Sequence, residues 1–220
     1  MTRFFVSPVE LGNNNIQLTG ENAAHAKVLR LKAGEQVLVC DGEGKECLCA
    51  VVDSLWNLAV LERRESDSEP AVQVSVYMAF PKADKLEHVI QKATELGVYE
   101  IVAFPSARCV SKPDEKSLKK KLERWQKIAA SAAEQSGRGR IPRVVILPSY
   151  AEALKRGAQS DLPMLFYENE RATTLHMALN AGEWKSAALL TGPEGGLEEK
   201  EVSQASLQKE KLLWSADRQL

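Results

Sequence analysis

The sequence predicts an α/β protein in which a small β-barrel precedes a mostly parallel α/β domain. Two observations support this fold class: short strand-like segments fill the first 65 residues, and strand and helix periodicity alternate after residue 71. Between these regions lies the polar stretch RRESDSEP, residues 63–70, which has the composition of a linker. The 220 residues, 44% of them hydrophobic, suffice for two buried cores. We therefore expect domains at residues 1–68 and 71–220.

The first domain is predicted from five short apolar segments that are separated by turn-forming residues. A helical segment interrupts them at 21–31, where Ala24, Val28 and Leu31 recur at helical spacing. Short strands at such intervals are typical of a small barrel. The expected strands are residues 3–6, 15–19, 35–41, 47–53 and 58–62.

The second domain begins with apolar residues at a period of two over 71–80, which indicates a strand. Its longest helix is expected over 114–137, where Leu118 and Trp125 share one face and Gly137 ends the pattern. The alternation that follows favours a mostly parallel sheet covered by helices. The other expected helices are 85–97, 150–158 and 171–182, and the other expected strands are 98–104, 143–147, 163–167 and 186–191.

The composition limits the compartment and the metal chemistry. The first segment of the chain has no long apolar stretch of the kind that directs export, and no window reaches the ~18 apolar residues of a membrane span. We therefore expect a cytoplasmic protein. The cysteines of the chain form no CxxC pair, and only three histidines are present. We therefore expect reduced cysteine thiols and no structural metal ion.

The turn TGPEGG, residues 191–196, is the first candidate for chemistry because it directly follows an apolar strand. Parallel sheets bind ligands at the carboxyl ends of their strands, but glycines can also serve a bare strand-to-helix connection. The turn matches neither a P-loop nor a dinucleotide fingerprint, and Glu194, Glu198 and Glu199 would repel phosphate. A ligand with adenosine and a sulfonium centre fits the turn better than a nucleoside triphosphate.

A basic cluster is the second candidate. Residues 108–143 carry 11 Lys and Arg against 4 Asp and Glu, which indicates a site for a polyanion. The lysines of the long helix are equally compatible with a solvated helix face. The loop arginines Arg138, Arg140 and Arg143 favour phosphate binding more strongly, because their planar donor groups suit that ligand.

Taken together, these residues resemble the RsmE family of SPOUT-class RNA methyltransferases. The resemblance rests on RFFV, HAKVLRLKAGE, KADKLEHVIQKATELGV, AAEQSGR, IPRV and LLTGPEGGLEEKEV, which occur in this order along most of the chain. It implies a PUA-like barrel that grips RNA and a domain whose deep trefoil knot binds S-adenosylmethionine. The implied reaction is N3-methylation of a uridine in 16S ribosomal RNA of the small (30S) subunit, by a homodimer.

The resemblance also assigns residues by position. A general base or a cation is needed because uridine N3 becomes nucleophilic only as its proton leaves. We predict Glu134 as the base and Arg138 as the cation, although an arginine of the C-terminal segment is an alternative. The implied cofactor residues are Thr191, Gly192, Pro193, Glu194, Gly195 and Gly196, with Phe166, Tyr167 and Glu168 on a neighbouring strand end. The implied RNA-binding residues are His25, Arg30, Ser106, Arg108, Gln135, Ser136 and Arg140.

The C-terminal segment departs from the family pattern. Related chains continue into a Leu-Gly-x-Arg-Ile-Leu-Arg-x-Glu-Thr-Ala segment that threads the knot, whereas this chain reads QKEKLLWSADRQL. Ser215, Arg218 and Leu220 are the candidates for its trace, and the knot segment is expected to be incomplete. Two alternatives therefore stay open: an RNA-binding remnant without cofactor, and a SPOUT methyltransferase that acts on another RNA.

Overall fold

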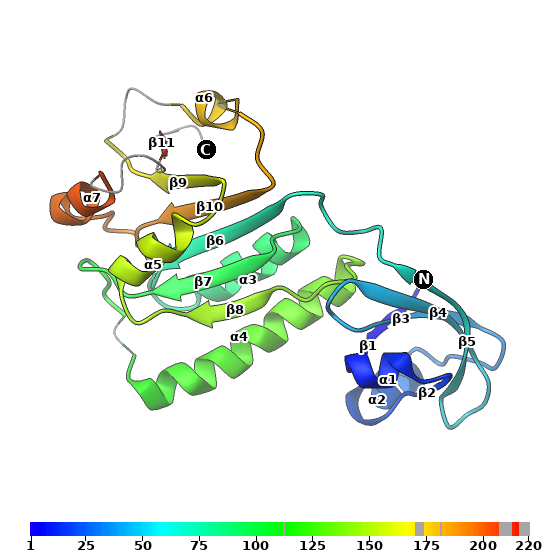
Figure 1. Cartoon of the computed structure of the whole chain (residues 1–220). Helices are drawn as coiled ribbons and strands as arrows, with labels where there is room; N and C mark the ends of the chain where they lie inside the picture. The colour runs from blue at the N-terminus through cyan, green and yellow to red at the C-terminus, as the bar shows by residue number, and fades with distance from the viewer. Residues whose placement is uncertain (112, 170–173, 181, 207–212, 216–220) are drawn as a thin grey trace. The chain divides into compact units, whose positions relative to one another are not determined.

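The computed structural model describes residues 1–111, 113–169, 174–180, 182–206 and 213–215. The chain forms two compact units, coloured along the sequence in Figure 1. The first unit comprises Met1–Glu69 together with Ser131–Ile141, and the second comprises Pro70–Ala130 together with Pro142–Leu220. The end of the long central helix therefore belongs to the first unit.

The first unit is a curled five-stranded sheet of order β1-β3-β4-β5-β2. Its β1 and β3 are parallel, while the other neighbouring strands are antiparallel. The core contains Phe4, Ile16, Val37, Val39 and Leu58, whose burial explains the predicted strands. The elements are β1 (Arg3–Phe5), α1 (Pro8–Gly12), β2 (Asn15–Gln17), α2 (Gly20–Val28), β3 (Gln36–Cys40), β4 (Lys45–Val51) and β5 (Asn57–Glu65).

Two local predictions for this unit need correction. Helix α1 was not predicted, because five residues are too short to show a helical period. Its signal is a capping box, in which Ser7 accepts from the Glu10 N–H while Glu10 accepts from the Ser7 N–H. The predicted linker also began too early, since residues 63–65 belong to β5 and pair with β4. They looked like a linker because that end of the strand is exposed and charged.

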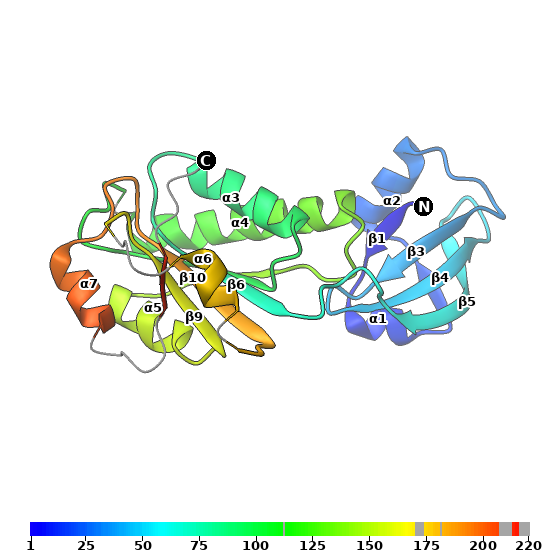
Figure 2. The ribbon, with the colours of Figure 1, turned by 90° about the horizontal axis from the view of Figure 1, so that it is seen from above.

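The second unit is built on a six-stranded parallel sheet of order β11-β9-β10-β6-β7-β8. Figure 2 shows α3 and α4 on one face of this sheet and α5 with α7 on the other, as right-handed crossovers require. The elements are β6 (Gln73–Ala79), α3 (Lys85–Glu95), β7 (Glu100–Phe104), α4 (Glu115–Gln135), β8 (Arg143–Ile146), α5 (Tyr150–Gly157), β9 (Leu162–Phe166), α6 (Leu175–Leu179), β10 (Ser186–Thr191), α7 (Glu199–Ser206) and β11 (Leu213–Ser215). The predicted alternation of strands and helices is confirmed.

One side chain covers the backbone of β8, the last strand of the described sheet. The Gln126 amide on α4 donates to the Pro142 carbonyl at 3.0 Å, and its oxygen accepts from the Val144 N–H at 3.0 Å. Gln126 thereby replaces a neighbouring strand and protects backbone groups that would otherwise be open to another chain.

We predict that Gln126→Ala lowers the free energy of unfolding by about 1–3 kcal/mol, because two backbone groups lose their partner. Lys127→Ala, one exposed residue further along α4, is the matched control and should change stability little. Urea unfolding curves for the two variants measure the difference. Equal stability of both variants would contradict a protective role for Gln126.

Candidate cofactor and RNA sites

The predicted glycine turn lies where two parallel strands of the second unit end. Thr191, the last residue of β10, pairs with Phe166 of β9 on one side and Met78 of β6 on the other. In the sheet, β10 lies next to β6. From this boundary, β6, β7 and β8 follow one another to one side, whereas β10 and β9 lie to the other side. Such a change of direction opens a crevice at the carboxyl ends of the strands, where α/β proteins bind ligands.

The geometry of the turn favours glycine at two of its positions. A Cβ atom on Gly192 would lie 3.0 Å from the Gly196 carbonyl carbon and 3.0 Å from Leu197 Cγ. Gly196 has φ +69°, and a Cβ there would lie 2.5 Å from Glu168 Oε1. The turn therefore packs closely against the loop that follows β9, with backbone in place of side chains along its surface.

Glu194 ties the turn to the loop that follows β6. Its carboxylate accepts from the Lys82 N–H at 3.1 and 3.2 Å and pairs with Lys85 Nζ at 2.9 Å. The hydrogen bond from Lys85 is the main reason why the pKa of Glu194 falls to about 2. Because that pKa is lowered, the contact is fully formed above the ordinary glutamate pKa of about 4.3 and is lost only as the pH falls through about 2.

Two further contacts tie the turn and the start of α7 to the loop that follows β7. The Arg108 guanidinium donates to the Gly195 carbonyl at 2.9 Å. The buried Glu201 carboxylate accepts from the Ala107 N–H and the Glu198 N–H, each at 2.9 Å. The turn is thus held from three strand ends before any ligand arrives, which is the preorganisation that a binding site needs.

The arrangement fits the cofactor that the sequence predicts. A surface of close-packed glycine backbone admits a flat adenosine moiety, and the carboxylates of Glu168 and Glu194 lie beside it. Acidic side chains disfavour phosphate and are compatible with a sulfonium cation. Phe166 and Tyr167 are half-buried at the adjoining strand end, as a pocket wall requires.

The predicted residues near the end of α4 lie in the first unit. Glu134 pairs with His25 Nδ1 at 3.0 Å, and both side chains are partly exposed. Arg138 is 3% exposed and pairs with Glu69 through its Nη2 at 2.6 Å. Arg140 donates to the Glu43 carbonyl at 2.6 Å, and its N–H donates to Glu69 at 3.0 Å. These arginines therefore hold the segment 137–140 against the barrel.

The remaining predicted RNA residues differ in their contacts. Gln135 and Ser136 are exposed, and the Ser136 hydroxyl donates to the Ala132 carbonyl at 2.7 Å. The Ser106 N–H donates to Cys109 Sγ at 3.2 Å. Among the described residues, no side chain pairs with the Arg30 guanidinium, which is exposed.

Arg30 stands at an unusual backbone position. Helix α2 ends in a Schellman motif, in which the Arg30 N–H donates to the Lys27 carbonyl and the Leu31 N–H donates to the Ala26 carbonyl. The residue at this position takes the left-handed conformation, for which glycine is preferred, and Arg30 has φ +55°. An exposed arginine held there at a cost in strain points to a function for its side chain.

Sequence reasoning missed the residues that hold the site together. Glu69, Lys82, Lys85 and Glu201 were not predicted, although each contacts a predicted residue or its loop. Glu201 carried a signal, because it is the third residue of α7 and binds the N–H of the residue before the helix. The others depend on contacts between segments distant in sequence and had no local signal.

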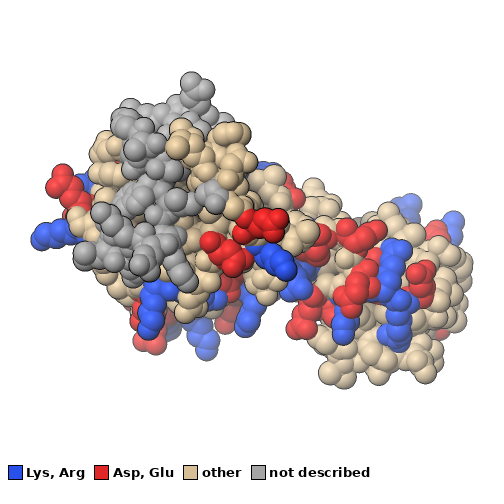
Figure 3. Space-filling view, turned by 45° about the horizontal axis from the view of Figure 1, so that its top comes forward, with Lys and Arg blue, Asp and Glu red and all other residues tan. Residues whose placement is uncertain are grey.

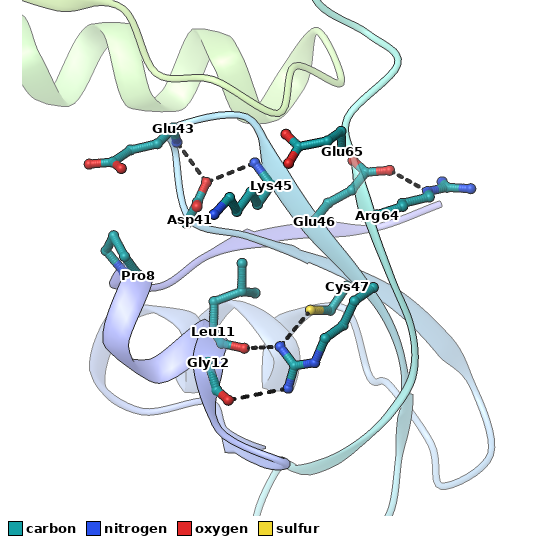
Figure 4. Close-up of a pocket in the computed structure, with 11 residues that line it drawn as sticks. Pro8, Leu11, Gly12, Asp41, Glu43, Lys45, Glu46, Cys47, Arg64 and Glu65 are labelled. Atoms are coloured by element: carbon teal, nitrogen blue, oxygen red, sulfur yellow. Dashed lines mark hydrogen bonds and ion pairs between the residues drawn. The ribbon is translucent and has the colours of Figure 1, made fainter.

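A pocket of about 480 Å³ in the first unit is a weaker candidate, because its polar groups satisfy one another (Figure 4). Asp41 accepts from the Glu43 and Lys45 N–H groups at 2.7 and 3.0 Å. Glu46 accepts from Arg64 Nε at 2.8 Å. Arg63 donates to the carbonyls of Leu11 and Asn13 and so caps α1. A ligand would have to displace these internal bonds.

Within the described ranges, no group of three or more His, Cys, Asp or Glu side chains is placed to hold a metal ion, and no helix is long and apolar enough to cross a membrane. All four cysteines are buried and free. Burial raises the pKa of Cys40 to about 11 and that of Cys49 to about 12, so both thiols stay protonated near neutral pH.

A curled sheet next to a parallel α/β unit with a preorganised glycine turn is the architecture of a ligand-binding enzyme, and two family models show that the class is RNA methyltransferase. Residues 68–213 match the model described as RNA methyltransferase domain, which is more than half of the chain. Residues 18–54 match the model described as RNA methyltransferase PUA domain. The chain belongs to the RsmE family, the ribosomal RNA small subunit methyltransferases E. The predicted family and fold class are confirmed.

Individual relatives span nearly the whole chain. A Bacillus subtilis (strain 168) protein named ribosomal RNA small subunit methyltransferase E is 36% identical over 223 residues, covering 94% of this chain and 86% of that protein. A protein of the same name from Mesomycoplasma hyopneumoniae (strain 232) is 30% identical, and the match covers 93% of this chain and 86% of that protein. A crystal structure of a ribosomal RNA small subunit methyltransferase E from Neisseria gonorrhoeae, bound to S-adenosyl methionine, matches with a TM-score of 0.84 and 28% identity. The match covers 100% of this chain and 91% of the chain in that structure.

Proposed function

We propose that this methyltransferase transfers the methyl group of S-adenosylmethionine to N3 of a uridine in 16S ribosomal RNA, in the cytoplasm. The glycine turn held by Glu194, Arg108 and Glu201 is the observation that carries the proposal. The cofactor would lie against Thr191 to Gly196 and the strand end at Phe166 to Glu168. Binding of this cofactor is supported by the crystal structure of the relative from Neisseria gonorrhoeae, which is bound to S-adenosyl methionine. When bound, the cofactor supplies an electrophilic methyl group.

The chain's own residues would then orient the uridine and move one proton. Alignment of N3 with the methyl carbon is the main requirement of an in-line displacement. The N3 proton needs an acceptor, and Glu134 is our proposal because its carboxylate is partly exposed. Since Glu134 lies near the end of α4, about 24 Å along the helix from Leu118 near its start, this role would belong to the partner subunit's Glu134 in the proposed homodimer. The predicted role of Arg138 as a cation stays a prediction, but its buried pair with Glu69 favours a positioning role for it.

The trefoil knot and the homodimer are part of this proposal. The backbone of Leu213–Ser215 pairs with Met164–Phe166 as strand β11, next to the cofactor-side strand end. Arg218 and Leu220, two candidates for the knot segment, lie outside the described residues. Light scattering coupled to size-exclusion chromatography measures the dimer directly.

The test is transfer of a tritiated methyl group to small ribosomal subunits that lack the modification, followed by mapping of the labelled base. We expect a labelled uridine whose methyl group is on N3. Calorimetry with S-adenosylmethionine runs in parallel and should show binding. Label in transfer RNA only would assign another substrate, and RNA binding without cofactor binding would identify a remnant.

Replacement of Arg30, whose backbone is strained, is expected to raise the stability of the protein and to lower its affinity for RNA. Arg30→Gly should raise the free energy of unfolding by up to about 1 kcal/mol, because glycine adopts the left-handed conformation without strain. The same variant should bind ribosomal RNA more weakly and reduce the salt dependence of binding by about one phosphate contact.

Arg30→Lys is the matched control, because it keeps both the charge and the strained backbone. It should leave stability unchanged and keep most of the RNA affinity, as salt titrations and thermal unfolding can show. Unchanged RNA affinity of Arg30→Gly would remove Arg30 from the RNA site.

A further inference from the structure

A cavity of about 320 Å³ lies in the second unit at the carboxyl ends of β6, β7 and β8. It is separate from the turn at the end of β10, and of the predicted RNA-binding residues Ser106 lines it. Its walls come from several elements: Phe80 after β6, Pro105 and Ser106 after β7, Leu118 on α4, and Leu147 and Pro148 after β8.

The walls suit a planar ring. Most of them are apolar, and Phe80 and the prolines present rigid ring surfaces. The few polar groups include the side chains of Ser106 and Ser111, which can hydrogen-bond the edge of a ring. A pocket of this kind, apolar with a small number of placed polar groups, fits a heteroaromatic base better than a charged or aliphatic ligand.

The cavity and the glycine turn share one loop. Ser106 and Cys109 line the cavity, while the two residues between them hold the turn, Ala107 through Glu201 and Arg108 through the Gly195 carbonyl. A ring in the cavity would therefore lie one loop away from the proposed cofactor surface.

The charges near the cavity favour a nucleic acid over a free base. Lys116, Lys119 and Lys120 are exposed on the first turns of α4 and flank Leu118 of the cavity wall in the sequence, where they outnumber the exposed acidic residues Asp114 and Glu115. Lysines in such positions attract the phosphates of a strand whose base enters the cavity. On the visible face of the barrel unit, acidic and basic side chains are interspersed (Figure 3).

We propose that this cavity receives one unstacked base of the RNA strand, with the adjoining phosphates held by the lysines of α4. Enzymes that modify a base take it out of the stack and bind it in a fitted pocket. The inference rests on the proposed function, because it names the place where that same reaction would hold its RNA.

A pair of bulky substitutions on one helix tests the proposal. Leu118→Trp fills the cavity, whereas Leu122→Trp, one turn later on α4 and also half-buried, lines a different groove. We expect Leu118→Trp to raise the KM for RNA by about tenfold or more, the range that loss of one stacked base produces. Affinity for S-adenosylmethionine and the melting temperature should stay near those of Leu122→Trp.

Two outcomes of that comparison would overturn the proposal. Wild-type KM in Leu118→Trp would show that no base enters the cavity, while the proposed methyl transfer would stand. Loss of S-adenosylmethionine affinity in Leu118→Trp alone would assign the cavity to the cofactor.

A second measurement needs no catalysis and so stays decisive if the wild-type chain transfers no methyl group. Cys109 is 4% exposed and lines the cavity, so iodoacetamide that enters the cavity should alkylate it slowly. The rate is followed by mass spectrometry in the presence of polyuridylate or of the polyadenylate–polyuridylate duplex. We expect the single strand to slow the reaction and the duplex, at equal phosphate concentration, to leave it unchanged. Equal rates with both polymers would overturn the proposal.

Discussion

Replacement of Arg138 by alanine is expected to lower the free energy of unfolding by about 3–5 kcal/mol, because it leaves a largely buried carboxylate without its partner. The Glu69 carboxylate is 18% exposed and contacts Arg138 Nη2 at 2.6 Å and the Arg140 N–H at 3.0 Å. Lys119→Ala, on the exposed face of α4, is the control and should change stability by less than about 0.5 kcal/mol. Urea unfolding measures both.

A double substitution separates stability from catalysis at this pair. Arg138→Leu with Glu69→Leu removes both charges, and such apolar replacements of buried pairs are often neutral or stabilising. We expect the double variant to regain both stability and methyl transfer, as a positioning role for Arg138 requires. A double variant that is folded and binds RNA, yet transfers no methyl group, would instead support Arg138 as the cation.

The sequence predicts the architecture well because the apolar periodicities are long and regular. Strand β10 begins and ends where expected, and α4 covers most of the predicted span. Prediction is poorer where burial is absent. The exposed end of β5 lacks alternation, and α1 is recognisable only from Ser7 and Glu10 of its capping box.

In the candidate site, too, features that depend on neighbouring residues could be predicted, whereas contacts between residues distant in sequence could not. The glycine turn is visible in the sequence because its backbone angles demand glycine. The partners that fix it are not visible, since Lys82 and Glu194 are 112 residues apart and meet only in the folded chain. The pair of Arg138 with Glu69, 69 residues apart, is hidden in the same way, so the burial of Arg138 could not be predicted from the sequence.

The glycine turn gives the second large effect, because Gly196→Ala meets two obstacles at once. Its φ of +69° costs an alanine about 1–2 kcal/mol. In addition, the new Cβ would lie 2.5 Å from Glu168 Oε1 and push that side chain away. We expect the affinity for S-adenosylmethionine, measured by calorimetry, to fall by about tenfold or more, since each 1.4 kcal/mol is a factor of ten.

Gly195→Ala is the matched control within the same turn. A Cβ there meets Arg108 Cβ at 3.5 Å, an ordinary contact, so this variant should fold with wild-type stability. If Gly195 contacts the cofactor, its alanine variant weakens binding through the contact alone, without any loss of stability. Unchanged affinity in Gly196→Ala would mean that the turn does not line the cofactor surface.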